Sequence, residues 1–275
     1  MPATPPTTSS MRLATRLHRG SPSRHMFAAC SATFWDERQQ VRCSSGPTQN
    51  LIPPVVVHDR APSRCEVQTP IDIRYRGFEV RQTPPNSTGF AHLVALKILE
   101  RFDLSELGYL SADTLHLLVE AKKLAFAVRE RYASDPRRRP VPVDELLDER
   151  FIDALIARID RKRAASIDLR EAWQAASSVT TARRHAGNTT YFCTIDGEGN
   201  AVSAIQSLNN AFGSAVTLGG TGVLLNNRMT CWHLDADHPN ALAADTRVRQ
   251  TMNAPIVLRD GRISTCPICL ASRHQ

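Results

Sequence analysis

Two short apolar segments joined by a glycine-containing turn constrain the fold of this chain more than any other stretch. TYFCTI (residues 190–195) and AVSAIQSL (residues 201–208) are rich in β-forming residues, and the DGEGN between them is typical of a hairpin turn. Neither segment has a purely polar face, so both faces of their sheet are expected to be covered. Further strand-and-turn signals follow in FGSAV (212–216), GVLLNN (222–227) and PIVLRDGR (255–262).

Helices are predicted upstream of this hairpin. A strand pair is expected first, in IDIRYRGFEV (residues 71–80), where Gly77 interrupts the alternation. Apolar residues then recur at helical spacing in three segments, about residues 90–102, 111–133 and 148–162. Ser87 or Thr88 is expected to cap the first helix, and Ser111 the second. Helices before strands, with a covered sheet, favour a layered αβ architecture.

The composition is that of a globular protein. Hydrophobic residues make up 42% of the 275 residues and charged residues 22%. No stretch stays apolar for the ~20 residues that a membrane helix needs, so a soluble protein is expected. The net charge of +7 is dispersed, without interleaved aromatic residues, which argues against nucleic-acid binding. The seven cysteines are irregularly spaced, which indicates reduced thiols and a cytoplasmic location.

Residues 1–65 are predicted to be a disordered or unrelated leader. The first 35 residues contain four arginines, many serines and threonines, and no acidic residue. That composition resembles a transit peptide, but the segment lacks an amphipathic repeat and an apolar secretory core. Stretches rich in proline and serine continue to about residue 65.

The residues at the mouth of the hairpin allow a self-made N-terminus at Thr189. A threonine hydroxyl is a weak nucleophile without a nearby base. The α-amino group of the same residue titrates near neutrality and can serve as that base, once the chain is cut just before it. Gly187 and Asn188 end a flexible-looking segment that suits such a cleavage. The same pattern also suits an ordinary strand start, in which Thr189 and Thr190 are simply β-branched strand residues.

Several long motifs occur in order along the chain. NTTYFCTIDGEGNAVSAIQSLNNAFGSA spans residues 188–215, and three further segments follow it: GTGVLLNNRM, PNALA and TRVRQTMNAPIVLRDGR. Three others precede it: YRGFEV, PPNSTGFA and LLVEAKKLAFAVRERYASDP. Together they resemble the γ-glutamyltransferase (glutathione hydrolase) family over about residues 66–262. The later motifs are similar to the start of the family's small subunit, and the earlier ones to the end of its large subunit.

The resemblance implies an N-terminal-nucleophile hydrolase of the α+β class, with an αββα four-layer sandwich that is incomplete here. Residues 66–188 would be the C-terminal part of the large subunit. Residues 189–275 would be the start of the small subunit, with an atypical tail from about 263. Both subunits arise from one precursor in this family. The implied reaction transfers a γ-glutamyl group to Thr189 and then to water or an amino acid. The implied partner is a small γ-glutamyl or amide substrate, glutathione included, with no metal, organic cofactor, nucleic acid or membrane.

The same resemblance assigns catalytic roles. Thr189 matches the nucleophile, and its bond to Asn188 matches the autoprocessing site. After cleavage, the α-amine of Thr189 would act as general base. Thr190 is the second threonine of the motif and is counted with the substrate-binding residues. Ser207 stands where the family has a hydroxyl residue that hydrogen-bonds the nucleophile; otherwise it is a small core residue.

Two more positions match substrate-binding residues of the family. Asn209 matches a substrate-binding asparagine, although an asparagine here also suits a plain turn. Arg228 occupies a position that is glutamine in some members.

Three departures from the family pattern support a second interpretation, an inactive fragment or pseudoenzyme. Most of the large subunit, with an arginine that binds the substrate α-carboxylate, has no match in this chain. Cys231 stands where many members have an acidic residue for the substrate α-amino group, and a thiol does not pair with an ammonium as a carboxylate does. After VLRDGR the chain reads ISTCPICLASRHQ, without the glycine-containing oxyanion loop. Losing such amide donors costs a rate factor of ~10² or more.

A third interpretation is a zinc-binding interaction protein. The segments CWHLDADH and CPIC contain residue types that bind zinc, namely Cys231, His233, Asp235, Asp237, His238, Cys266 and Cys269. The family resemblance already accounts for the first segment, so no residue is assigned to a metal. The sequence has no Gly-x-Ser-x-Gly elbow and no phosphate-binding glycine loop, which argues against nucleotide chemistry.

Overall fold

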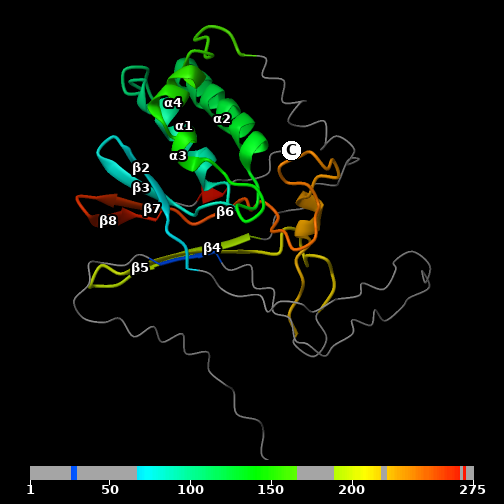
Figure 1. Ribbon diagram of the computed structural model, residues 1–275. Coiled ribbons are helices and arrows are strands. Elements are labelled where there is room, and N and C mark those ends of the chain that lie inside the picture. Colours follow the sequence, from blue (N-terminus) through cyan, green and yellow to red (C-terminus); the bar gives the residue numbers. More distant parts are fainter. Residues whose placement is uncertain (1–25, 30–66, 166–188, 218–221, 267–268, 271–275) are drawn as a thin grey trace, which may run out of the picture.

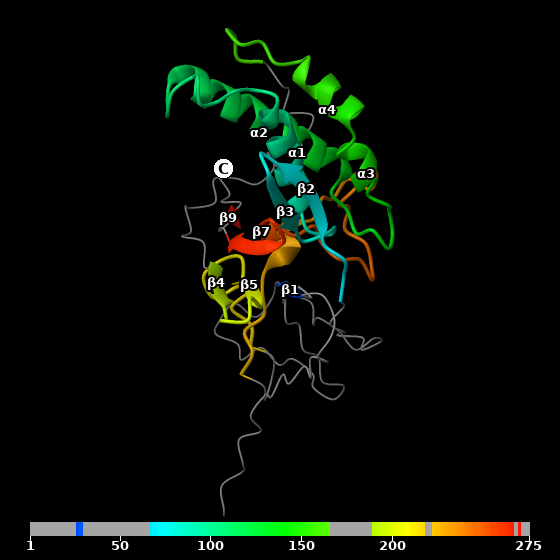
Figure 2. The same ribbon diagram turned by 90° about the vertical axis from the view of Figure 1, so that its left-hand side faces the viewer.

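The computed structural model describes residues 26–29, 67–165, 189–217, 222–266 and 269–270. Asn188 and nearly all of the predicted leader lie outside these residues. The described elements form three layers, with helices above a four-stranded sheet and a second sheet below it (Figures 1 and 2). None of the helices in the described ranges combines the length and the apolar character needed to cross a membrane.

The four-stranded sheet joins the two halves of the chain. Its order is β2 (Ile71–Tyr75), β3 (Phe78–Gln82), β7 (Ile256–Arg259) and β8 (Arg262–Thr265), and neighbouring strands are antiparallel. The strand pair predicted around Gly77 is confirmed. Arg76 and Gly77 both have positive φ, 49° and 83°, as the tight turn of a two-residue hairpin requires. The strand-and-turn prediction for PIVLRDGR is confirmed as well, because it forms β7, a turn and the start of β8.

The helical layer contains α1 (Gly89–Glu100), α2 (Ala112–Tyr132), α3 (Val143–Leu146) and α4 (Glu149–Ile156). Its apolar faces meet in one core, whose largest fully buried members include Phe90, Leu117, Leu124, Leu146 and Ile152. Leu93 of α1 packs on Ile73 and Val80, which holds the helices on the four-stranded sheet. The three predicted helical segments are therefore confirmed.

Two details of the helices differ from the predictions. Ser111 caps α2 as expected, since its hydroxyl accepts a hydrogen bond from Thr114 N at 3.1 Å. Thr88 stands at the N-cap of α1 but makes no side-chain cap bond, and the Ser87 hydroxyl donates to Met252 O at 2.9 Å instead. The cap prediction at Ser87 or Thr88 is wrong because a distant partner binds the serine. The third helix also ends early, at Ile156 instead of about residue 162.

The second sheet contains the predicted hairpin. Strands β4 (Thr189–Ile195) and β5 (Ala201–Ser207) are antiparallel, and β1 (Met26–Ala29) pairs with β5 in parallel. Residues 201–205 of β5 alternate between buried and half-buried, but in the described part of the chain β4 is mostly exposed. Phe192 and Ile195 remain 53% and 54% exposed. The expectation that both faces are covered is therefore wrong for β4 within these residues.

Short elements connect the layers. A 3-10 helix, η1 (Arg228–Cys231), follows the hairpin, and β6 (Met252–Asn253) pairs with β9 (Cys269–Leu270). Ile205 of β5 packs against Met252 and Ala254, which attaches the hairpin to the segment before β7. FGSAV and GVLLNN were predicted as strands, but among the described residues neither forms one. The Leu225 amide donates to Val216 O at 2.9 Å, and Leu224 makes an isolated bridge with Thr217, which follows FGSAV.

Asp135 ties the helical layer to the C-terminal half. Its carboxylate is buried and accepts hydrogen bonds from Arg137 Nη2 at 2.7 Å and from the Arg247 amide at 2.8 Å. Burial alone would raise the pKa of Asp135, but these hydrogen bonds outweigh it and hold the pKa below its usual value of 3.8.

Replacing Asp135 by asparagine is expected to lower the free energy of unfolding by about 2 kcal/mol at pH 7, because charge-assisted hydrogen bonds are lost. A carboxyl group whose pKa is lower in the native than in the unfolded state stabilises the native state at pH values above its unfolded-state pKa. The difference between the two proteins should therefore shrink as the pH falls below about 4. Urea unfolding at pH 7 and pH 3 measures this, with Asp72→Asn on the exposed side of β2 as a control. Equal stabilities at pH 7 would contradict the expected role of Asp135.

Candidate active site

Thr189 and Ser207 face each other across the open end of the hairpin. Thr189 is the first residue of β4 and Ser207 the last of β5, and the antiparallel register pairs them directly. The Thr189 hydroxyl donates a hydrogen bond to Ser207 Oγ, with 3.0 Å between the oxygens. Thr189 is exposed among the described residues. The contact is the one that the family resemblance expects of a nucleophile and its hydroxyl partner, while the catalytic roles stay predictions.

Asn209 holds Ser207 in this position. Its backbone amide donates to Ser207 Oγ at 3.0 Å, so the serine oxygen receives two hydrogen bonds. Asn209 has a φ of 76°, a left-handed conformation that asparagine tolerates better than most residues. Its side-chain Nδ2 donates to Asn227 Oδ1 at 2.9 Å, and the same oxygen accepts from the Asn210 amide. Asn227, which the sequence did not single out, therefore positions the chain that follows β5.

The two remaining substrate-binding candidates lie apart from this contact. Thr190 is paired with Gln206 in the register, and strand alternation puts its side chain on the face opposite to that of Thr189. Arg228 is buried in η1, where its Nη1 donates to Thr251 Oγ1 at 3.3 Å. The structure thus groups Thr189, Ser207 and Asn209, and ties Arg228 to the segment before β6.

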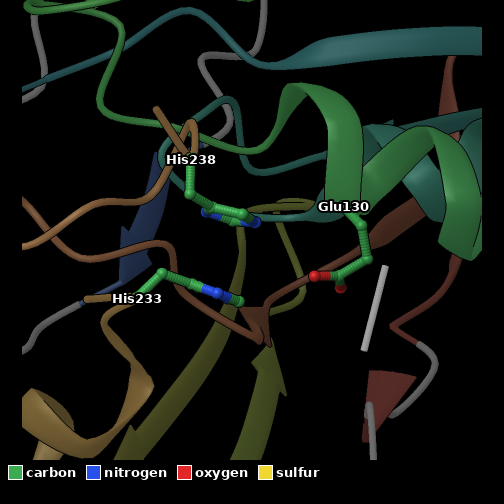
Figure 3. A group of neighbouring side chains, drawn as sticks. All are labelled: Glu130, His233 and His238. Carbon is green, nitrogen blue, oxygen red and sulfur yellow. The ribbon is translucent and has the colours of Figure 1, made fainter. Parts of the chain in front are cut away.

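A second group of polar side chains lies between α2 and the loop after η1. The rings of His233 and His238 are stacked, with centroids 3.4 Å apart and planes 11° from parallel. Ligand atoms of both rings and of the Glu130 carboxylate all lie within 4.8 Å of one another (Figure 3). Two of the seven residues suggested for zinc are thus brought together, and Glu130 joins them. Nothing in the sequence pattern marks Glu130, which looks like an ordinary polar residue of an amphipathic helix.

Burial and neighbouring charges shift the pKa values of Glu130, His233 and His238. Glu130 binds two arginines, Arg129 through Oε1 and Arg249 through Oε2. Burial favours the neutral carboxyl, but these two guanidinium groups outweigh it and lower the pKa of Glu130. Burial also lowers the pKa of His233, with a smaller contribution from Arg249. The pKa of His238 falls to about 4, because of burial first and then of the neighbouring His233 and Arg249 charges. Both rings are therefore neutral at neutral pH.

Comparisons of this chain with known proteins agree on one family. The model of the gamma-glutamyltranspeptidase family matches residues 56–266. The chain is 36% identical over 208 residues to the glutathione hydrolase-like YwrD proenzyme of Bacillus subtilis, covering 76% of this chain and 37% of the relative. It is 36% identical over 207 residues to the acylase ACY 1 proenzyme of a Pseudomonas species, covering 75% and 35%. The glutathione hydrolase proenzyme of Escherichia coli is 32% identical over 220 residues, covering 76% and 37%.

Solved structures agree with the sequence comparison. A cephalosporin acylase from Bacillus halodurans aligns with a TM-score of 0.60 and 31% identity, over 72% of this chain and 33% of that one. This likeness confirms the predicted α+β sandwich of the N-terminal-nucleophile hydrolase type. The chain spans little more than a third of the length of the curated relatives it matches. With a family model that matches most of its residues, the chain belongs to the gamma-glutamyltranspeptidase family.

Proposed function

We propose that this chain cleaves itself before Thr189 and then uses that residue as the nucleophile of an acyl-transfer reaction. The observation that carries the proposal is the 3.0 Å hydrogen bond between the hydroxyls of Thr189 and Ser207 at the start of β4. Relatives named as glutathione hydrolase, acylase and oxamate amidohydrolase proenzymes support it, since each of those names denotes hydrolysis of an amide or release of an acyl group.

The proposed chemistry follows from the atoms at Thr189. Cleavage frees its α-amine, which takes the hydroxyl proton while Oγ1 attacks the substrate carbonyl. Collapse of the tetrahedral intermediate forms an ester on Oγ1, breaks the amide bond and passes the proton to the departing amine. Water or an amino acid then attacks the ester and regenerates the hydroxyl. Ser207 Oγ, fixed by the Asn209 amide, orients the Thr189 hydroxyl before each attack.

The proposed substrate class rests on Cys231. Its thiol is partly buried in η1, and its carbonyl accepts a hydrogen bond from Asn240 Nδ2 at 2.7 Å. A thiol does not pair with a substrate ammonium as a carboxylate does. An amide without a free α-amino group therefore suits this chain better than glutathione does.

Intact-mass measurement of the purified full chain tests the proposal. Incubation at neutral pH should convert it into fragments of residues 1–188 and 189–275, and sequencing should find Thr189 at the new N-terminus. Release of amine from oxamate, a cephalosporin and glutathione then compares the substrate classes, with the first two expected to react faster. A mass that stays unchanged over days would favour an inactive fragment or pseudoenzyme.

A further inference from the structure

The cluster of Glu130, His233 and His238 takes no part in the reaction described above. We propose that it binds one divalent transition metal ion of the zinc class, through the two imidazoles and the Glu130 carboxylate. Glu130 precedes the predicted cleavage point and both histidines follow it. Such an ion would therefore join the C-terminal end of α2 to the loop after η1.

The placement of the ligand atoms suits a small ion. In a tetrahedral zinc site, bonds of about 2.1 Å put neighbouring ligand atoms about 3.4 Å apart. Here the three ligand atoms lie within 4.8 Å of one another. The lone pairs of the two stacked rings run nearly parallel, so closing the site requires movements of roughly 1 Å and a tilt of the His238 ring toward the ion. Glu130 and His233 are buried at 6% and 7% exposure, whereas His238 sits on a partly exposed loop that can adjust. Two histidines and a glutamate, with a fourth position left for water, form a known zinc ligand set.

The state of the imidazoles also favours a metal. His233 Nδ1 is buried and has no hydrogen-bond partner among the described residues, which is unfavourable for a polar group. A metal ion would satisfy a ring nitrogen in this position.

Three contacts oppose metal binding and limit its strength. Arg129 and Arg249 hold Glu130, and their positive charges repel a cation, although an ionised carboxylate keeps further lone pairs for a metal. The same arginines fix the orientation of the carboxylate, as outer partners of metal ligands do. His238 Nδ1 accepts a hydrogen bond from the Asn240 amide at 3.0 Å, and a metal on that ring must displace a proton or break this bond. Affinity near micromolar, weaker than in structural zinc fingers, is therefore expected.

Titration of the metal-free full chain with Co²⁺ tests the site. One equivalent should bind and give visible absorption of tetrahedral type without a thiolate charge-transfer band, and Zn²⁺ should displace it. Glu130→Gln, His233→Gln and His238→Gln should each weaken binding by at least about tenfold. His116→Gln is a matched histidine control on α2, and the double change Cys266→Ser with Cys269→Ser removes the CPIC thiols; both should bind as the unchanged chain does.

The outcomes separate this site from the other possibilities. The proposal is overturned if Co²⁺ does not bind stoichiometrically. It is also overturned if Co²⁺ binding survives each of the three ligand substitutions, or if binding is lost when the two cysteines are replaced. Circular dichroism checks that the variants fold, and His238→Gln on the loop perturbs the core least. Nuclear magnetic resonance of the unchanged chain needs no variant at all: two histidine rings should shift on Zn²⁺ addition, and rings that stay in place overturn the site. Thr189→Ala should bind metal normally, which separates this proposal from that of self-cleavage.

Discussion

Replacing Thr189 by alanine is expected to leave the chain as a single polypeptide, with cleavage before residue 189 slowed by at least about 10³-fold. The reason is that alanine removes the hydroxyl that donates to Ser207 Oγ, and with it the atom that attacks the preceding peptide carbonyl. Thr189→Ser keeps that hydroxyl and should keep cleavage. The measurement is the mass of the intact chain and of its fragments over several days at neutral pH.

Thr190→Ala is the matched control for this substitution. Thr190 is also a threonine at the start of β4, but strand alternation puts its side chain on the opposite face of the hairpin. Cleavage should therefore continue in the Thr190 variant. Fragments formed as readily by the Thr189→Ala chain, or lost only in the Thr190→Ala chain, would show that the wrong hydroxyl has been assigned.

Replacing Phe90 by alanine is expected to lower the free energy of unfolding by about 3–5 kcal/mol, the usual cost of removing a fully buried aromatic ring. Phe90 has no exposed surface, and it lies in the core formed by α1, α2 and α4. Neighbouring side chains are packed closely enough that only part of the cavity can collapse. Equilibrium unfolding in urea, followed by circular dichroism, measures the change.

Phe192→Ala tests whether burial causes that loss. Phe192 is 53% exposed on β4, so its removal should cost less than about 1.5 kcal/mol. If the two variants lose equal stability, the helical core does not dominate the stability of the chain as its packing indicates.

Local pattern explains why much of the fold could be predicted. The pairs β2–β3 and β4–β5 are close in sequence and joined by short turns, so alternation and turn residues indicate them directly. The cap of α2 depends on Ser111 and Thr114, three residues apart. The contact between Thr189 and Ser207 follows from the same hairpin, because its register puts the first residue of one strand opposite the last residue of the other.

Tertiary packing explains the wrong or missing predictions. Ser87 bonds the carbonyl of Met252, 165 residues away, instead of the start of its own helix. The end of α4 tightens through hydrogen bonds from Arg158 N to Leu155 O and from Ile159 N to Ile156 O, which lets Ile159 pack on the core after the helix has ended. Glu130 meets the two histidines only through tertiary packing, which single-sequence periodicity does not report.

The turn at residues 196–200 sets the register of β4 and β5, and that register determines where the Thr189 hydroxyl lies. Asp196 accepts hydrogen bonds from the amides of Glu198 and Asn200, which fixes the length of the turn. Seven consecutive pairs then carry that register to Thr189, over roughly 20 Å of strand. A slip of a single residue at the turn would rotate the Thr189 side chain to the other face, away from Ser207. An exposed aspartate far from the hydroxyl therefore decides on which side of the sheet that hydroxyl stands.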